Sequence, residues 1–377
     1  MSIGASVKFS KATFFLIFFI KTKFSILIPN LFWPDSKFHE IYQELSLPAI
    51  ETLFAKSSRT KFDSEGVEDW LCKAFSVRRQ HDIPVAPLTL LADKTFDIEA
   101  GEKYWLRADP VHLRVEHDQV LLADSRTFHI SLEEASQFVE VINKYFSQDN
   151  LTSQNGDNKK ELISIFPLCA DRWYLCLQKP PLIHTHLLSD VIVKNINDYF
   201  PYGPEEMFWR GLLNEVQMLL HEHPLNQIRE ERGDLALNGI WFWGGGISPE
   251  PVISPYEYVW SNDVFLSSLA IASGINLMEL PNNMEAWPHL NKSDRQLIFL
   301  NSLYGKAQYG DAHGWRESLK ELEKNWFMPM LTMLRQGIIK QVTITAINEG
   351  VTRNFFITRN NLYRFWRLGR PFPTYID

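Results

Sequence analysis

The stretch His223–Gly246, HPLNQIREERGDLALNGIWFWGGG, decides the fold class that the sequence predicts. Within it, the apolar run Ile240–Trp243 stops at three consecutive glycines, Gly244, Gly245 and Gly246. A continuous apolar run is typical of a buried strand in a parallel sheet, whose carboxyl end leads to a ligand crevice. Glycines there permit positive φ angles and the close approach of a ligand to main-chain N–H groups. A sharp turn after a core strand fits the same pattern, so both interpretations stay open.

Composition limits the class of protein. A length of 377 residues predicts about two domains. Hydrophobic residues make up 45% of the chain and charged residues 22%, as in ordinary globular proteins. The net charge of −7 favours neither nucleic acid nor an anionic membrane as a partner. No protein partner is indicated by the sequence.

Cysteine usage points to a reducing compartment. The three cysteines, Cys72, Cys169 and Cys176, are an odd and sparse set, which argues against a disulfide framework. We therefore expect free thiols and a cytoplasmic location.

The N-terminus carries a short apolar run. Residues 12–20, ATFFLIFFI, are flanked by lysines, and nine residues are too few to span a bilayer as a helix. No Ala-x-Ala cleavage site follows them, which argues against a secretory signal peptide. We interpret residues 1–23 as an N-terminal extension and Phe24–Ile28 as the first core strand.

Strand and helix patterns alternate over the last part of the chain, which favours a parallel α/β sheet. Pro48–Lys56 reads as an amphipathic helix with proline in its first turn. The polar residues 147–161 read as an exposed loop. The expected later elements are a helix from 204 to 221, a strand at 238–243, a helix at 263–273, strands at 275–280 and 296–303, a helix at 315–334 and a strand at 338–347.

Several residues are candidates for anion or metal binding. Arg107 and Arg114 have the chemistry to bind a phosphate or carboxylate, but a salt-bridged strand end is the favoured interpretation. Asp311 and His313 lie where a strand gives way to a helix and are candidate metal ligands. Asp311 alternatively caps that helix.

Four segments, taken in order, carry a resemblance to a known family. They are Ala108–Arg114, then His223, Pro224, Asn226 and Arg229, then Asn238–Gly246, and finally Gly310, Asp311, Gly314 and Glu317. Together they resemble the archaeal-type, cofactor-independent phosphoglycerate mutases of the alkaline phosphatase superfamily, over roughly residues 100–345.

That resemblance implies an α/β fold, an alkaline-phosphatase-like, mostly parallel sheet flanked by helices, with a small inserted α+β subdomain. The core would comprise residues 24–107 and 191–377, and the inserted subdomain residues 108–190. A narrower likeness is to a proteobacterial branch of phosphoglycerate-mutase-like regulatory proteins of the RpfE type.

The chain departs from the family pattern at the metal site. The resemblance implies two divalent metals held by Asp and His, and a serine nucleophile, for which Ser57 and Ser58 are the weak candidates by position. The first strand ends in Pro29–Asp35, which keeps only the trailing acid, Asp35. Tyr304–Asp311 and Ala346–Gly350 replace two further ligand motifs with Lys, Ala, Gln, Tyr and Asn. Two-metal phosphoryl transfer needs several ionised ligands.

We therefore expect a non-catalytic regulatory or phospho-metabolite-binding protein without a cofactor. Its ligand would be a phosphorylated or carboxylated small metabolite. The alternative is an active 2,3-bisphosphoglycerate-independent mutase or phosphatase with a divalent metal pair in a rearranged site, for which Asp35, Asp311 and His313 are candidate ligands. A scaffold with an empty cleft is a third interpretation. The expected ligand-binding residues are Arg114, Asn226, Arg229, Gly244, Gly245 and Gly246.

Overall fold

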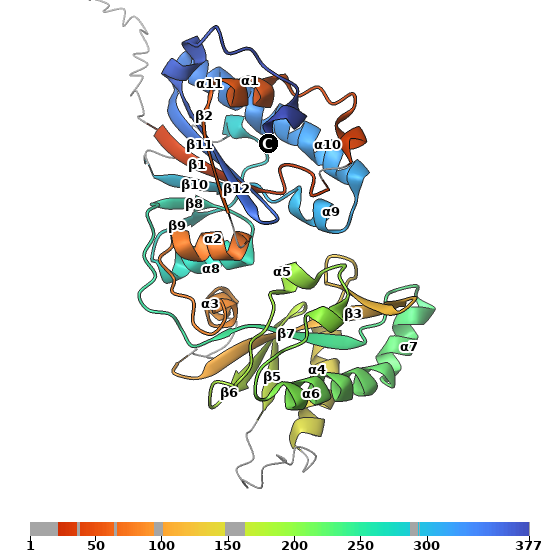
Figure 1. Cartoon of the computed structure of the whole chain (residues 1–377). Helices are drawn as coiled ribbons and strands as arrows, with labels where there is room; N and C mark the ends of the chain where they lie inside the picture. Colours follow the sequence, from red (N-terminus) through yellow and green to blue (C-terminus); the bar gives the residue numbers. More distant parts are fainter. Residues whose placement is uncertain are drawn as a thin grey trace, which may run out of the picture.

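A computed structural model shows a large unit built on a seven-stranded sheet and a second unit built on a five-stranded sheet (Figure 1). The structure describes residues 22–35, 38–63, 66–93, 101–147, 163–286, 293 and 295–376. The apolar run at 12–20 and nearly all of the polar stretch at 147–161 lie outside the described residues. Among the described helices, none is both long and apolar enough to cross a membrane.

The large sheet is mostly parallel and has β1 at its centre. The strand order is β2-β12-β11-β1-β10-β8-β9, and β1 pairs in parallel with both β10 and β11. Only the β11–β12 and β12–β2 pairs are antiparallel. The strands are β1 (Thr22–Pro29), β2 (Ser58–Asp63), β8 (Tyr258–Trp260), β9 (Asn276–Met278), β10 (Gln296–Phe299), β11 (Ile339–Asn348) and β12 (Val351–Thr358). The expected first core strand is thus confirmed.

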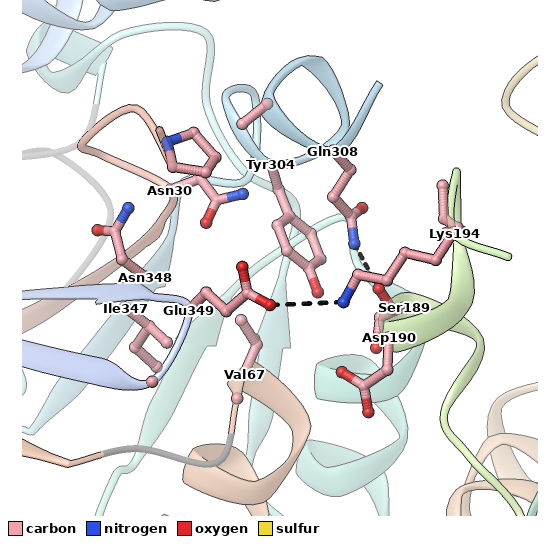
Figure 2. Close-up of a pocket in the computed structure, with 15 residues that line it drawn as sticks. Asn30, Val67, Ser189, Asp190, Lys194, Tyr304, Gln308, Ile347, Asn348 and Glu349 are labelled. Carbon is pink, nitrogen blue, oxygen red and sulfur yellow. Dashed lines mark hydrogen bonds and ion pairs between the residues drawn. The ribbon is translucent and has the colours of Figure 1, made fainter. Parts of the chain in front are cut away.

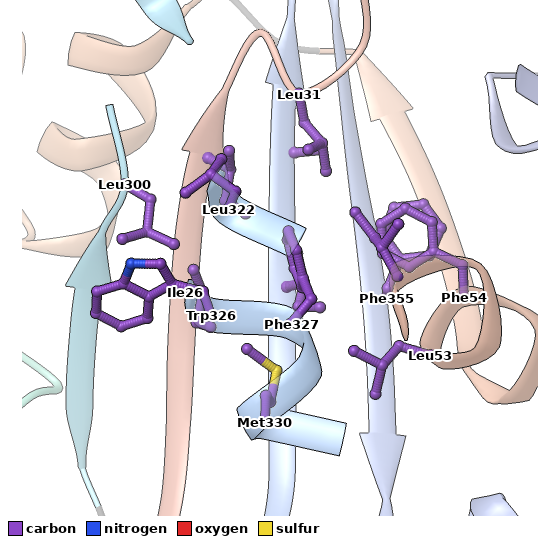
Figure 3. Close-up of a cluster of buried hydrophobic side chains, with 14 of the residues drawn as sticks. Ile26, Leu31, Leu53, Phe54, Leu300, Leu322, Trp326, Phe327, Met330 and Phe355 are labelled. Atoms are coloured by element: carbon purple, nitrogen blue, oxygen red, sulfur yellow. The ribbon is translucent and has the colours of Figure 1, made fainter. Parts of the chain in front are cut away.

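Helices cover both faces of this sheet. One face packs on a buried cluster that joins Ile26 and Phe355 of the sheet to Phe54, Trp326 and Phe327 (Figure 3). Burial of such large rings supplies most of the driving force for this layer. The elements on this face are α1 (Pro48–Lys56), α10 (Ala312–Leu322), a π-helical turn (Glu323–Phe327) and α11 (Met328–Gln336).

The opposite face carries a second apolar cluster. Leu27 of β1 points to this face because successive strand residues alternate, and it meets Leu71 and Leu266. The covering helices are α2 (Val67–Ala74), α3 (Val85–Ala92) and α8 (Val264–Ala272). The fold class predicted from the sequence, an α/β sheet flanked by helices, is confirmed.

The second unit is built around the long strand β3 (Tyr104–Glu116). Its five-stranded sheet has the order β4-β3-β6-β5, and β7 lies off this path, pairing antiparallel with Trp105–Val111 of β3. The other strands and helices are β4 (Gln119–Ala123), α4 (Leu132–Ser147), β5 (Ser164–Cys169), β6 (Arg172–Leu177), α5 (Leu188–Val191), α6 (Glu206–His221), α7 (Pro224–Glu231) and β7 (Gly239–Gly246).

The glycine-ended strand β7 differs from its prediction. It lies in the second sheet, antiparallel to β3, and not at the centre of the parallel sheet. Consequently the second unit runs from β3 to β7, residues 104–246, and exceeds the predicted 108–190. Ile240 and Phe242 of β7 share a buried cluster with Leu106 of β3 and Trp209 of α6, which keeps these elements together.

Candidate functional site

Asparagine lies at the carboxyl ends of four neighbouring parallel strands. Asn30 directly follows β1, and Asn348 is the last residue of β11. Asn301 and Asn262 lie two residues beyond β10 and β8. Ligands of open α/β sheets bind outside the carboxyl ends of the strands. Each amide offers both donors and an acceptor but no charge.

A pocket of about 220 Å³ lies at this edge, between the two units (Figure 2). The large unit contributes Asn30, Asn348 and Glu349 from the sheet edge. A short helix, α9 (Tyr304–Gln308), supplies one wall, and the second unit closes the pocket with Asp190 and Lys194. We call this space the amide pocket.

The three segments that depart from the family pattern all meet in the amide pocket. Asn30 and Pro34 come from the segment after β1, Tyr304 and Gln308 from α9, and Asn348 from the end of β11. The sequence singled out these segments only as departures from the family's metal-ligand motifs, and the structure places them together. Lys194 was missed, because residues 190–194 carry no recognisable pattern and reach the pocket only through the path of the second unit.

One ion pair spans the amide pocket. Lys194 Nζ lies 3.4 Å from Glu349 Oε1, and Figure 2 shows the two side chains reaching toward each other. The Glu349 side chain is 81% exposed, so this pair costs little to separate. Burial raises the pKa of the nearby Asp190, which favours its neutral form.

The asparagine Asn30 is held in a conformation that suits its residue type. Its φ angle is +50°, in the left-handed region that asparagine tolerates better than most residues. Its N–H donates to the Ile347 carbonyl at 2.7 Å, and its own carbonyl accepts from Trp315 Nε1 at 2.9 Å. These backbone bonds fix the strand end while the side chain faces the pocket (Figure 2).

Helix α9 ties the two units together beside the pocket. Gln308 Nε2 donates to the Ser189 carbonyl at 2.8 Å, and its Oε1 accepts from Arg126 at 2.8 Å. The Tyr309 hydroxyl donates to Asp124 at 2.7 Å. These bonds cross from the large unit to the second unit and set the width of the pocket.

A second polar recess of about 260 Å³ lies farther along the same cleft, near the ends of β8 and β10. Its arginines are already paired. Arg107 donates to both oxygens of Asp109 at 2.8 Å, and the rings of Tyr174 and Trp243 lie 5.1 and 5.2 Å from its guanidinium carbon. We call this the arginine recess.

Arg172 is held in the same way at the arginine recess. It donates to both oxygens of Asp93 at 2.8 Å, and the Tyr174 hydroxyl donates to Asp93 at 2.5 Å. Burial acts to raise the pKa of Asp93, but the hydrogen bonds from Arg172 and Tyr174 outweigh it and lower this pKa. The cations at this end of the cleft are thus neutralised by buried carboxylates.

Glu68, in the first turn of α2, lies between the amide pocket and the arginine recess. Its carboxyl interacts with Ser189 and Asp190 of the second unit and with Asp263 beside α8. Burial, reinforced by these two acids, raises its pKa to about 7, although its own N–H and Ser189 act in the opposite direction.

Two of the expected ligand-binding residues are engaged in packing. Arg229 is fully buried and donates to the carbonyls of Leu235 and His129 at 2.9 and 2.7 Å. The Asn226 amide accepts from the Leu237 N–H and donates to the carbonyls of Leu220 and Leu237. Both side chains tie α7 to its neighbours in the second unit, and they line neither the amide pocket nor the arginine recess.

The remaining ligand-binding candidates lie apart from Arg229. Arg114 is exposed at the far end of β3 and pairs with Glu116. Gly244, Gly245 and Gly246 are buried, and a Cβ at Gly245 would come within 2.4 Å of the Tyr104 hydroxyl. These glycines permit close packing of β7 against α3 and β3. The structure therefore does not gather the predicted anion site.

The serine candidates lie away from the amide pocket, at the start of the terminal strand β2, level with the middle of β1 and β11. Ser57 is buried at the end of α1, where its hydroxyl donates to the Phe54 carbonyl at 2.8 Å. Ser58 begins β2 and pairs with Phe356, whereas the carboxyl end of β2 pairs with Val351, next to the amide pocket.

The metal-ligand candidates form no cluster. Asp311 caps α10 by accepting from the Gly314 N–H at 2.8 Å, and it pairs with Lys306 at 3.3 Å. His313 and Asp35 are exposed. Within the part of the chain that the structure describes, no group of three or more His, Cys, Asp or Glu side chains is placed to hold a metal ion.

Comparison with curated proteins gives a partial likeness to one class of enzyme. The chain is 28% identical over 171 residues to the 2,3-bisphosphoglycerate-independent phosphoglycerate mutase of Methanosarcina barkeri, covering 44% of this chain and 40% of that protein. It is 26% identical over 183 residues to the mutase of Methanosarcina mazei, covering 46% and 44%. The chain thus matches about two-fifths of the length of these distant homologues.

The fold is also found among solved structures. The PH0037 protein of Pyrococcus horikoshii superposes with a TM-score of 0.50 at 10% identity, over 90% of this chain and 87% of that one. The cofactor-independent phosphoglycerate mutase of Thermoplasma acidophilum has a TM-score of 0.43 at 12% identity, over 94% of each chain. No protein-family model matches the chain.

The homologues correct one prediction. From the sequence we expected a protein without a cofactor. Its curated homologues are, however, 2,3-bisphosphoglycerate-independent phosphoglycerate mutases. This is the class for which the resemblance implies a divalent metal pair. The residues of the amide pocket include two carboxylates, Asp190 and Glu349, and Glu349 already pairs with Lys194. Asn30, Asn348 and Gln308 offer neutral amides, and Lys194 places a cation beside them. A pair of divalent ions needs several anionic oxygen or imidazole ligands.

Proposed function

We propose that this phosphoglycerate-mutase-like protein binds a small phosphorylated or carboxylated metabolite in the amide pocket and acts as a regulatory protein without transferring the phosphoryl group. One observation carries the proposal: Lys194 already holds a carboxylate, that of Glu349, inside a pocket lined by amides. A ligand anion would take the place of the exposed Glu349 carboxylate.

The chemistry of the pocket supports this assignment. Lys194 supplies a charge-assisted hydrogen bond to an anion, which is worth roughly 1.5–3 kcal/mol. Asn30, Asn348 and the Tyr304 hydroxyl can pair with the hydroxyl groups of a hydroxy acid, since amides and phenols both donate and accept. Three-carbon phosphorylated acids, the substrates named for the homologues, fit this combination of an anion and hydroxyl groups.

Calorimetric titration with 3-phosphoglycerate and 2-phosphoglycerate tests the proposal. We expect binding to the intact protein, and a loss of about 10- to 150-fold in affinity in Lys194→Met, because one charged hydrogen bond is removed. Glu349→Gln should bind several-fold more tightly, because the competing carboxylate is gone. Lys340→Met, which removes an exposed lysine of β11 remote from the pocket, is the matched control.

Two results would contradict the proposal. One is the absence of binding by the folded protein at millimolar phosphoglycerate. The other is a phosphoglycerate affinity that is the same in Lys194→Met, Glu349→Gln and the Lys340→Met control.

The activity named for the homologues supports a second function, an active mutase or phosphatase with a rearranged metal site. A coupled assay with 3-phosphoglycerate and added Mn²⁺ separates the two proposals. We expect no turnover above the protein-free reaction. Turnover on the order of 1 s⁻¹, within the usual enzyme range, would establish the second function and overturn the non-catalytic one.

A further inference from the structure

The segment after β12 exposes an unusual set of side chains. Phe365, Trp366 and Leu368 are 80%, 67% and 77% exposed, and Tyr363 is 67% exposed. Three arginines, Arg364, Arg367 and Arg370, alternate with them. We call residues 363–370 the arginine–aromatic segment. Large exposed rings in one short stretch are unusual for a surface that faces only water.

The arginine–aromatic segment is fastened to the large unit by its backbone and its arginines. Arg367 Nη1 donates to the Ser57 carbonyl at 2.7 Å, and Lys56 Nζ donates to the Arg364 carbonyl at 2.6 Å. The Arg370 N–H donates to the Tyr375 hydroxyl at 3.1 Å. The segment is therefore held in place with its apolar rings still directed outward.

The charge of this region opposes that of the whole chain. The protein has a net charge of −7, yet residues 351–376 contain Arg353, Arg359, Arg364, Arg367 and Arg370 and no Asp or Glu. Burial lowers the pKa of Arg59 of β2, and the charges of the nearby Arg367 and Arg370 act in the same direction. Among the described residues, no ion pair links Arg59, Arg367 or Arg370 to a carboxylate.

The arginine–aromatic segment adjoins an open edge of the large sheet. Among the described strands β2 is a terminal one, and all six of its residues are exposed. Its first residue directly follows Ser57, whose carbonyl Arg367 holds. An open edge strand offers unpaired N–H and C=O groups to an added strand.

We propose that this surface binds an acidic, extended segment of a partner protein, which pairs with the edge of β2 and places its carboxylates against Arg59, Arg367 and Arg370. Trp, Tyr and Arg are the residues that dominate protein–protein binding energy. Phe365 and Trp366 would cover the apolar side chains of the segment. This site is independent of the amide pocket.

The charge pattern argues against a symmetric dimer of this chain through the same surface. A two-fold interface would place the arginines of one copy against those of the other. An acidic partner instead neutralises the cluster, and Arg–carboxylate pairs are among the strongest surface hydrogen bonds.

Fluorescence anisotropy with the full-length protein tests the proposal. The probe is a fluorescein-labelled ten-residue peptide of alternating Glu and Val, and the charge control is the alternating Lys and Val peptide. We expect saturable binding of the acidic peptide only. Methylation of its alternate backbone nitrogens should weaken binding at least tenfold, because pairing with β2 is lost.

Two pairs of substitutions locate the binding. Arg367→Glu with Arg370→Glu should weaken binding of the acidic peptide at least tenfold. Lys144→Glu with Lys324→Glu, an equal change in net charge on exposed lysines elsewhere, should change it less than twofold. Phe365→Ser with Trp366→Ser removes only outward-facing rings, so this variant should keep its melting temperature and still bind at least fivefold more weakly.

Several outcomes would overturn the proposal. They are no binding of the acidic peptide at millimolar concentration, an equal loss in the two charge-reversal pairs, or full affinity in the folded Phe365→Ser/Trp366→Ser variant. Tighter saturable binding to phosphatidylserine vesicles or to a single-stranded oligonucleotide than to the acidic peptide would also overturn it, in favour of a lipid or nucleic-acid surface.

Discussion

The two ends of the interdomain cleft use charge in opposite ways. In the arginine recess, Arg107 and Arg172 are buried or nearly so and grip Asp109 and Asp93 with paired hydrogen bonds. In the amide pocket, Lys194 and Glu349 meet in a long, exposed contact among uncharged amides. Breaking a buried pair strands a charge, whereas separating an exposed pair costs little. The difference indicates that the recess stabilises the protein and the pocket is available to a ligand.

The largest effect is expected from removing one partner of a buried ion pair in the arginine recess. Asp109→Ala should lower the free energy of unfolding by about 3–5 kcal/mol, since the guanidinium of Arg107 is left buried without its carboxylate. Urea denaturation followed by tryptophan fluorescence measures the loss. The double variant Arg107→Met/Asp109→Leu, which strands no charge, should lose clearly less, and an equal loss in both would refute this interpretation.

Gly245→Ala tests whether the glycine run belongs to packing or to binding. The new Cβ would lie 2.4 Å from the Tyr104 hydroxyl and 2.7 Å from Leu106 Cδ2, so we expect a loss of about 1–3 kcal/mol in stability. Phosphoglycerate affinity should stay within twofold of the unmodified protein. Gly369→Ala, which has open space for its Cβ and, like Gly245, no positive φ, allows for the general effect of such a change. A Gly245→Ala variant that keeps its stability but binds phosphoglycerate weakly would indicate that the glycines belong to the ligand site.

Glu68 makes stability depend on pH. Its folded pKa of about 7 lies above the ordinary value near 4.5, so the folded state binds more protons between these pH values. The contribution of this group to stability should therefore be greatest below pH 4.5, and it should fall by about 3 kcal/mol as the pH rises from 4.5 through 7. Glu68→Gln should remove this component from melting curves recorded between pH 5 and 8. An unchanged pH slope would contradict the assignment.

The smallest effect on stability is expected in the amide pocket. Lys194→Met should change the free energy of unfolding by no more than about 0.5 kcal/mol, as for exposed ion pairs generally. The same variant should nevertheless lose phosphoglycerate affinity. A destabilisation as large as that of Asp109→Ala would erase the contrast between the two ends of the cleft.

The sequence predicted local structure well where a local pattern determines it. Pro48–Lys56 forms the expected helix with proline in its first turn, and Asp311 caps α10. β7 runs from Gly239 to Gly246, so it includes the glycines that were expected to end it. Its place in the fold was also misjudged, because a buried apolar strand reads alike in a parallel and an antiparallel sheet. Its partner β3 lies more than a hundred residues away, and no local signal names it.

The sequence pointed to segments that line the amide pocket, but it did not identify which side chains face it. Departures from the family pattern at Tyr304, Gln308 and Asn348 pointed to residues that line the amide pocket. Arg229 was favoured because guanidinium groups bind anions, yet its partners are backbone carbonyls and Glu134. Residue type alone does not distinguish an arginine that binds ligand from one that closes a turn.

The central position of β1 has a consequence for synthesis on the ribosome. β1 ends at Pro29, and its two sheet neighbours begin only at Gln296 and Ile339. At about 5–20 residues per second, this strand emerges on the order of tens of seconds before either partner is made. The ribosome synthesises all of the second unit, from β3 to β7, during this interval. The nascent chain thus carries an unpaired apolar strand through most of its translation, which is a natural target for a chaperone that binds extended hydrophobic segments.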